Sequence, residues 1–80
     1  MIDGTIADQV FTKAAQGTIR TTNLGGYAAV HIGITEYTVT IFRNNRAEIT
    51  SKREWNLTHL NGVYATPEQD AALRAAWARH

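Results

Sequence analysis

Apolar and polar residues alternate through the middle of the chain, from residue 27 to residue 49. Successive side chains of a β-strand point to opposite faces of the sheet. Val39 and Ile41 therefore share one face of a strand. Thr40 and Phe42 share the other face. We expect the face of Val39 and Ile41 to be buried, because burial of aliphatic side chains is the main favourable term in folding.

The segments before this strand extend the same pattern. Aliphatic residues occupy every second position from 28 to 32, and a turn of even length within residues 33–36 aligns them with Val39 and Ile41. Residues 18–22 are rich in β-branched side chains, which favour strands. Residues 23–26 have the composition of a turn that leads into the next strand.

A hairpin is expected after the central strand, at Arg43-Asn44-Asn45-Arg46. Asparagine tolerates the positive φ of two-residue hairpin turns, but a two-residue loop would place Ile41 opposite Glu48 and mix the two faces. A three-residue loop from Asn44 to Arg46, with a bulge, places Ile41 opposite Ile49 instead. Burial of both side chains favours this register.

The C-terminal segment carries a strong helix start. The Thr66 hydroxyl can accept a hydrogen bond from a backbone amide of the first helical turn, and Gln69 completes a capping box. Pro67 suits the first helical position. The following residues are rich in alanine and contain no glycine or further proline. We predict a helix from Pro67 to about Arg79.

Residues 5–16 place apolar side chains at helical spacing before Gly17, which predicts a second helix at the N-terminal end. The predicted fold is therefore α+β. An antiparallel meander of three to four strands is flanked by an N-terminal helix and a capped C-terminal helix.

Residues 52–65 permit two interpretations. Asn61-Gly62 favours a tight turn, which would join residues 57–60 and 63–65 in a second short hairpin. Otherwise this stretch forms an irregular loop whose apolar side chains fill the edge of the core. Both interpretations bury Trp55.

Composition limits the function classes. Eighty residues make one domain, 1–80, and a domain of this size has a small core, for which subunit association is a common supplement. The chain has no cysteine and hence no disulfide. It also lacks an apolar run of the ~20 residues needed to span a bilayer, and its first residues lack the basic and apolar sections of a secretory signal. We expect a cytoplasmic protein that contacts no membrane, with a homodimer as one arrangement.

Catalytic chemistry finds no support in the sequence. His31 and His59 lie near no cysteine and in no spacing that gathers metal ligands on one helix turn. Ser51 is the sole serine and has no nucleophile motif around it. The aspartate and glutamate residues mostly occupy positions expected in helix caps, turns and solvent-exposed faces, and they do not suggest a pair for acid–base catalysis. We predict no catalytic residue, no metal site and no cofactor, and a protein that is not an enzyme.

The face of the sheet opposite the predicted core is the first candidate binding surface. It carries Tyr27, His31, Thr40 and Phe42, and an apolar surface of this kind that is open to solvent tends to mark a contact site. The alternative is that the N-terminal helix covers this face and makes it a second core layer. With the face exposed, we expect a protein partner, which can be a second copy of the chain.

A basic hairpin is the alternative binding surface. Arg43 and Arg46 flank the predicted hairpin, and Lys52 and Arg53 follow, so a basic ribbon could meet nucleic-acid phosphates while Trp55 stacks on a base. The formal net charge is only +1, whereas nucleic-acid-binding domains usually have a concentrated positive excess. This observation ranks nucleic-acid binding second.

No motif carries a family assignment. In style, the small size, the absence of cysteine and the C-terminus rich in alanine and arginine resemble accessory proteins encoded by bacteriophages or mobile elements of GC-rich bacteria. Such a resemblance implies a protein that binds a surface of a host protein. The sequence thus predicts a non-enzymatic protein-interaction module.

Overall fold

The computed structural model describes residues 4–23, 25–43, 46–54, 57–59 and 62–78. Within these ranges the elements are α1 (Gly4–Gln16), β1 (Arg20–Thr22), β2 (Gly25–Ile32), β3 (Thr35–Phe42), β4 (Arg46–Glu54), β5 (Leu57–His59), β6 (Val63–Tyr64) and α2 (Pro67–Ala78). The predicted order of helix, antiparallel meander and helix is confirmed. The strands follow one another across the sheet in the order β1-β2-β3-β4-β5, and β6 also pairs with β4.

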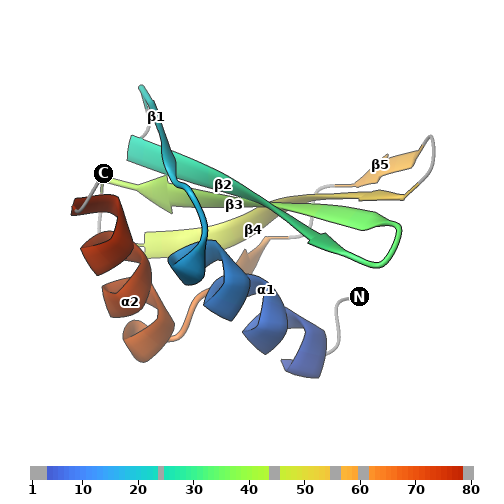
Figure 1. The fold of residues 1–80 in the computed structure, drawn as a ribbon, viewed down its shortest axis with the longest axis horizontal. Coiled ribbons are helices and arrows are strands. Elements are labelled where there is room, and N and C mark those ends of the chain that lie inside the picture. Colours follow the sequence, from blue (N-terminus) through green and yellow to red (C-terminus); the bar gives the residue numbers. More distant parts are fainter. Residues whose placement is uncertain (1–3, 24, 44–45, 55–56, 60–61, 79–80) are drawn as a thin grey trace.

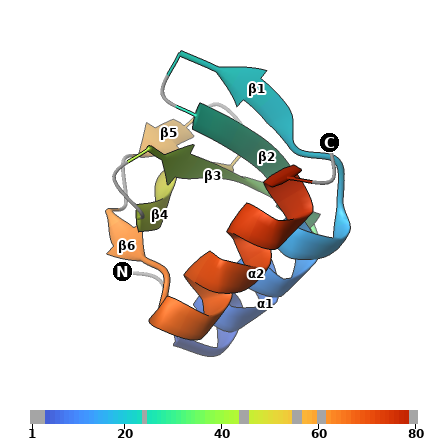
Figure 2. The same cartoon turned by 90° about the vertical axis from the view of Figure 1, so that its left-hand side faces the viewer.

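Both helices lie on the same side of the sheet, as two nearly perpendicular views show (Figures 1 and 2). The N-terminal helix therefore does not cover the face of Phe42, which was the alternative that the sequence left open. The described residues form one helical layer and one sheet, and no helix among them lies over the other face of that sheet.

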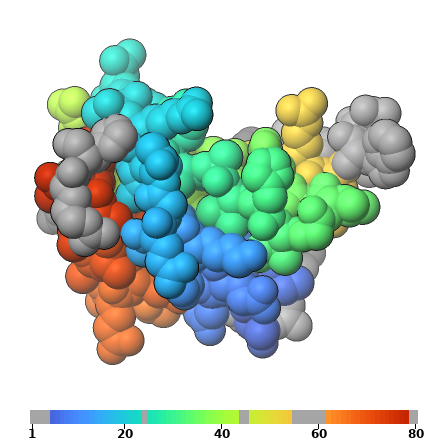
Figure 3. Space-filling model, viewed as in Figure 1, coloured from blue at the N-terminus to red at the C-terminus, as the bar shows by residue number. Residues whose placement is uncertain are grey.

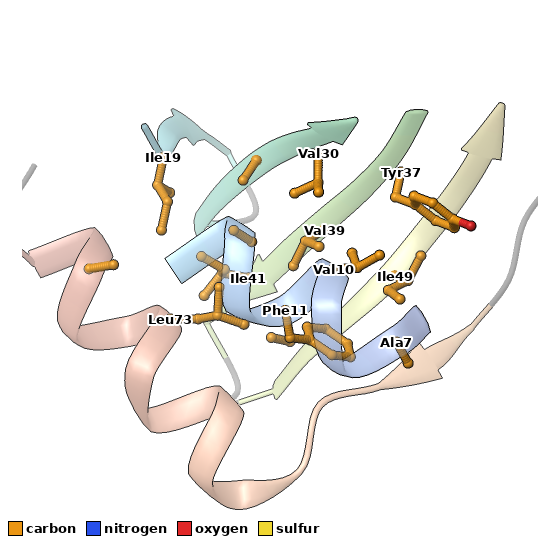
Figure 4. Close-up of a cluster of buried hydrophobic side chains, with 14 residues drawn as sticks. Ala7, Val10, Phe11, Ile19, Val30, Tyr37, Val39, Ile41, Ile49 and Leu73 are labelled. Carbon is orange, nitrogen blue, oxygen red and sulfur yellow. The ribbon is translucent and has the colours of Figure 1, made fainter. Parts of the chain in front are cut away.

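The core lies between the helices and the sheet (Figure 4). Its buried side chains are Ala7, Val10, Phe11, Ala14, Ile19, Ala28, Val30, Tyr37, Val39, Ile41, Ala47, Ile49, Leu73 and Ala76. Val39 and Ile41 have no exposed surface, which confirms the predicted direction of the central strand. The periodicity of apolar residues was sufficient to identify the buried face.

α2 begins with the capping box that the sequence predicts. The Gln69 backbone amide donates to the Thr66 hydroxyl at 3.2 Å, and the Thr66 amide donates to Oε1 of Gln69 at 2.9 Å, which completes the capping box. The same Gln69 side chain donates through Nε2 to Oδ1 of Asp8 on α1 at 2.6 Å. The cap of one helix is thus joined to the exposed side of the other.

Gly25 and Gly26 begin β2 and do not lie in the turn before it, where their composition suggested. They allow α2 to approach the sheet closely. A Cβ atom at Gly26 would lie 3.2 Å from the indole of Trp77. Gly25 has a φ of 138°, and a Cβ atom there would lie 2.2 Å from the carbonyl oxygen of Ile41. A side chain at either position would push apart elements that are in contact.

The β2–β3 pair has the register that the alternation predicts. A two-residue turn joins the strands, and Ala28 lies opposite Val39. Gly33, the first residue of this turn, has a φ of 63°. Tight hairpin turns need a positive φ at this position, which glycine adopts without steric cost.

The β3–β4 hairpin has a loop of odd length, as predicted, but its register differs from the prediction by two residues. Ile49 lies opposite Val39, and the expectation that it lies opposite Ile41 is wrong. The residues between the strands are 43–45 rather than 44–46. A shift of two residues keeps every side chain on its own face, so alternation does not distinguish the two registers.

β4 contains a bulge at Thr50. The register of the β3–β4 pair shifts by one between Thr38 and Val39, which leaves Thr50 as an extra residue on β4. The Thr50 hydroxyl donates to the carbonyl oxygen of Thr38 at 3.3 Å and shares a hydrogen bond of 2.8 Å with the Thr40 hydroxyl. From Ser51 onward, each residue of β4 lies on the face opposite to the one that uninterrupted alternation would give it.

β5 and β6 both pair with β4 and not with each other. β5 pairs with residues 52–54 of β4, and β6 pairs with residues 48–49. The second hairpin between residues 57–60 and 63–65 is therefore wrong. β4 is nine residues long, and its edge presents backbone N–H and C=O groups that can pair with another strand. The two short strands β5 and β6 pair with separate parts of this edge. Trp55, which we expected to be buried, lies outside the described residues.

The contact at Gly25 predicts a large cost for adding a methyl group. We expect Gly25→Ala to lower the free energy of unfolding by about 3 kcal/mol or more, because both the backbone conformation and the contact with Ile41 oppose a Cβ atom. Gly33→Ala is the matched control. It also has a positive φ, but nothing lies within 4 Å of its Cβ position, so its cost should be about 1 kcal/mol. Urea unfolding of both variants measures the difference, and equal losses would contradict the close approach.

Candidate functional site

The face of the sheet that points away from the helices is termed the outer face. Side chains directly opposite one another on neighbouring strands share a face, so the register arranges the outer face in rows. One row contains Arg20, Tyr27, Thr40, Glu48 and Tyr64, the next contains Gly25, Phe42 and Arg46, and a row farther along β2 contains His31, Glu36 and Arg53.

The first two rows bring three aromatic rings and two arginines to one end of the outer face. We call Arg20, Tyr27, Phe42, Arg46 and Tyr64 the aromatic end. Tyr27 and Phe42 are half-buried, and Tyr64 is 55% exposed. The Arg46 guanidinium carbon lies 5.0 Å from the centre of the Tyr64 ring, within the range of a cation–π interaction. Aromatic rings and guanidinium groups thus adjoin on an accessible surface.

A hollow lies within the aromatic end and is lined by Phe42, Arg46, Glu48 and Tyr64. Its lining combines apolar ring surface, one cation and one carboxylate. The hollow can receive an apolar side chain that carries a polar group at its tip.

α2 positions the backbone beneath the aromatic end. Nη2 of Arg74 donates to the carbonyl oxygen of Phe42, and its Nε donates to Oδ2 of Asp70 at 3.2 Å. Asp70 and Arg74 are an i,i+4 ion pair on α2, and Arg74 reaches from the helix to the last residue of β3. This contact fixes the end of the strand that carries Phe42.

Thr40 lies on the outer face, as the sequence predicts, but it contributes little surface to that face. It is on the middle strand between Tyr27 and Glu48, and it is 8% exposed. Its hydroxyl shares the hydrogen bond with Thr50. Thr40 thus supports the surface around it and offers few atoms to a partner.

His31 shares the outer face with Tyr27 but not the aromatic end. The two residues are four positions apart on β2, a distance of about 13 Å along a strand. His31 Nε2 lies 3.3 Å from Oε2 of Glu36, and the His31 side chain is 69% exposed. The predicted set of Tyr27, His31, Thr40 and Phe42 thus lies on one face but in two separate regions.

The four predicted basic residues do not form one ribbon. Arg43 and Arg46 lie at the hairpin end of β4, whereas Lys52 and Arg53 lie six and seven residues from Arg46, roughly 20 Å away along the strand. Lys52 also lies opposite Tyr37, on the side of the helices, and its Nζ is 3.2 Å from Oε1 of Glu54. The positive charges therefore divide between the two ends and the two faces of the sheet.

Tyr64 is the member of the aromatic end that sequence reasoning missed as a site residue. It joins the surface because β6 pairs with β4 and places it opposite Glu48. Its alternation with Val63 was a weak signal, because a two-residue strand is too short for a period to be recognised. Only the long-range pairing brings Tyr64 next to Arg46.

The described residues contain no group of three or more histidine, cysteine, aspartate or glutamate side chains that could hold a metal ion. In the same part of the chain, no helix combines the length and apolar character needed to cross a membrane. Comparisons of the chain with protein-family models, curated proteins and solved structures find no significant match.

The contact between Arg46 and Tyr64 predicts energetic coupling. In a double-mutant cycle with Arg46→Met and Tyr64→Leu, we expect a coupling energy of about 0.5 kcal/mol, the usual value for an exposed cation–π pair. Methionine and leucine keep most of the apolar volume, so the coupling reports the charge and the ring. Chemical unfolding of the four proteins provides the measurement, and strictly additive losses would show that the two side chains do not interact.

Proposed function

We propose that the protein is a non-enzymatic interaction module that binds another protein through the aromatic end of the outer face. The observation that carries the proposal is an accessible sheet face on which Phe42 shares a hollow with the stacked pair of Arg46 and Tyr64, and half-buried Tyr27 lies on the same face two strands from Arg46. Tyrosine, other aromatic residues and arginine are enriched at the energetic centres of protein interfaces.

Rigidity supports this role. The aromatic end lies on paired strands, and the last residue of β3 is held by Arg74 of α2. Side chains on a fixed backbone lose less conformational entropy on association than side chains on a loop. The surface is thus organised before a partner arrives.

The charges favour a protein partner over a nucleic acid. Glu48 lines the hollow beside Phe42, Arg46 and Tyr64, and its carboxylate would repel a phosphate backbone. A protein surface with acidic groups opposite Arg20 and Arg46, and one cationic or hydrogen-bonding group opposite Glu48, complements this pattern. If the resemblance to phage and mobile-element accessory proteins holds, the partner is a host protein.

Truncation of the two central rings tests the proposal. The immobilised protein is used to capture partners from a lysate of the organism that encodes it, with and without nuclease. We expect a captured protein that resists nuclease, and we expect Tyr27→Ala and Phe42→Ala each to weaken its binding by about 2 kcal/mol, roughly 30-fold in Kd.

Ile34→Ala is the matched control, because Ile34 is 81% exposed and lies in the β2–β3 turn, outside the aromatic end. It should leave binding unchanged. Circular dichroism and thermal unfolding establish that each variant is folded. Full retention of the partner by folded Tyr27→Ala and Phe42→Ala would refute the proposal.

A direct titration tests the nucleic-acid alternative. Under the main proposal, fluorescently labelled single- and double-stranded oligonucleotides should show no tight binding near physiological salt. The alternative predicts instead an affinity that falls steeply as salt rises and that is lost in the Arg43→Glu/Arg46→Glu double variant. That outcome would replace the protein-binding proposal with a nucleic-acid-binding one.

A further inference from the structure

The edge of β2 is only partly covered. β1 pairs with Gly25, Gly26 and Tyr27, and its last pair joins Arg20 to Tyr27. In the described part of the chain, no strand pairs with this edge of β2 from residue 28 to residue 32. The second half of β2 and the turn after it lie at the surface, beside the blue segment that leads from α1 to β1 (Figure 3).

The β2–β3 turn determines which backbone groups face the open edge. Ile32 and Thr35 close a two-residue turn, so this pair exchanges both backbone hydrogen bonds. Hydrogen-bonded and non-hydrogen-bonded pairs alternate along an antiparallel ladder, and residues 28 and 30 therefore also bond to β3. The N–H and C=O groups of Ala29 and His31 must then point toward the open edge, where both residues are exposed.

This edge lacks the usual features that prevent strand pairing. Protected edges carry lysine or other charged residues, proline or a bulge. Residues 28–32 read Ala-Ala-Val-His-Ile, and His31 is the only polar side chain among them. The edge can accept another strand.

The side chains along this edge complement a second copy of the same segment. Antiparallel pairing of residues 28–32 with themselves overlaps in full only when Val30 lies on the two-fold axis. Ala28 then faces the partner's Ile32, and Ala29 faces the partner's His31. Each small side chain meets a large one, and the two Val30 side chains meet each other on the core side.

A hollow on the outer face lies beside Ala29 and can receive the partner's histidine. It has a volume of about 410 Å³ and is lined by Thr18, Arg20, Tyr27, Ala29 and Glu36. The Glu36 carboxylate can accept a hydrogen bond from an entering imidazole, as it is placed to do with His31 of its own chain at 3.3 Å. The hollow is therefore large enough for the partner's His31 and offers it a carboxylate as a hydrogen-bond acceptor.

We infer that two copies of this chain associate through residues 28–32 of β2, antiparallel about a two-fold axis at Val30, with each His31 entering the hollow beside the partner's Ala29. The sheets become continuous, and the two outer faces point to the same side. This association does not depend on the proposed function, but it would present two aromatic ends together and raise the avidity for a partner with repeated sites.

Molar mass is the first test. Light scattering after size-exclusion chromatography should give twice the chain mass of 8.9 kDa for the natural protein at high concentration. Ala29→Lys, which fills the hollow and places a charge at the edge, should give the mass of one chain. Ala75→Lys makes the same substitution at an exposed position of α2 and should remain a dimer. A natural protein that stays monomeric, or an Ala29→Lys variant that stays dimeric, overturns the inference.

Cross-linking tests the register, because the chain has no cysteine of its own. Hydrogen-bonded antiparallel pairs have Cα atoms about 5.5 Å apart, a distance that a disulfide can bridge. An equimolar mixture of Ala29→Cys and His31→Cys proteins under mild oxidation should form a covalent dimer much faster than either protein alone. A mixture that cross-links no faster than the separate proteins overturns the proposed pairing.

Discussion

Burial of the single aliphatic face of the sheet is the interaction on which the rest of the structure depends. Val39 and Ile41 lie at the centre of that face and have no exposed surface. Both helices carry apolar side chains that are buried against this aliphatic face. The other face of the sheet offers mainly threonine, charged groups and half-buried rings. The two helices therefore lie side by side on one layer, and they contact each other as well as the sheet. As a direct consequence of where the aliphatic residues fall, neither of the two described helices lies over the outer face.

The helical layer also organises the surface on the far side. Arg74 donates to the backbone of Phe42, and Trp77 lies against the two glycines that begin β2. These contacts fix the ends of the two strands that carry Tyr27 and Phe42. A binding surface built on a single sheet would otherwise twist and flex freely, because an isolated sheet has no packed layer to hold its shape. Packing on one face is thus coupled to geometry on the other.

The parts of the fold that follow from local or periodic signals could be predicted from the sequence. The capping box of Thr66 and Gln69 and the direction of Val39 in the central strand are examples, because each depends on residues a few positions apart. The β3–β4 register could not be predicted, since a shift of two residues keeps each side chain on its face. The position of Tyr64 required knowledge of a strand pairing between distant segments. The sequence identified the face of Tyr27 and Phe42, and the separation of His31 from Tyr27 also follows from their spacing of four residues on one strand, although the predicted site did not take it into account.

The bulge at Thr50 holds one extra residue in β4, and the stretches before and after it both pair with consecutive residues of β3, which fixes their faces. Deletion of this one residue would restore simple alternation and leave Lys52 on the helical side and Arg53 on the outer face, while Ile49 and the hairpin also keep their places. Changes in chain length are usually tolerated only in loops. Here a single-codon deletion inside a strand would shorten β4 by its one unpaired residue without moving any other side chain to the opposite face. The bulge thus allows the length of β4 to change by one residue while the surface and the core on its two faces stay the same.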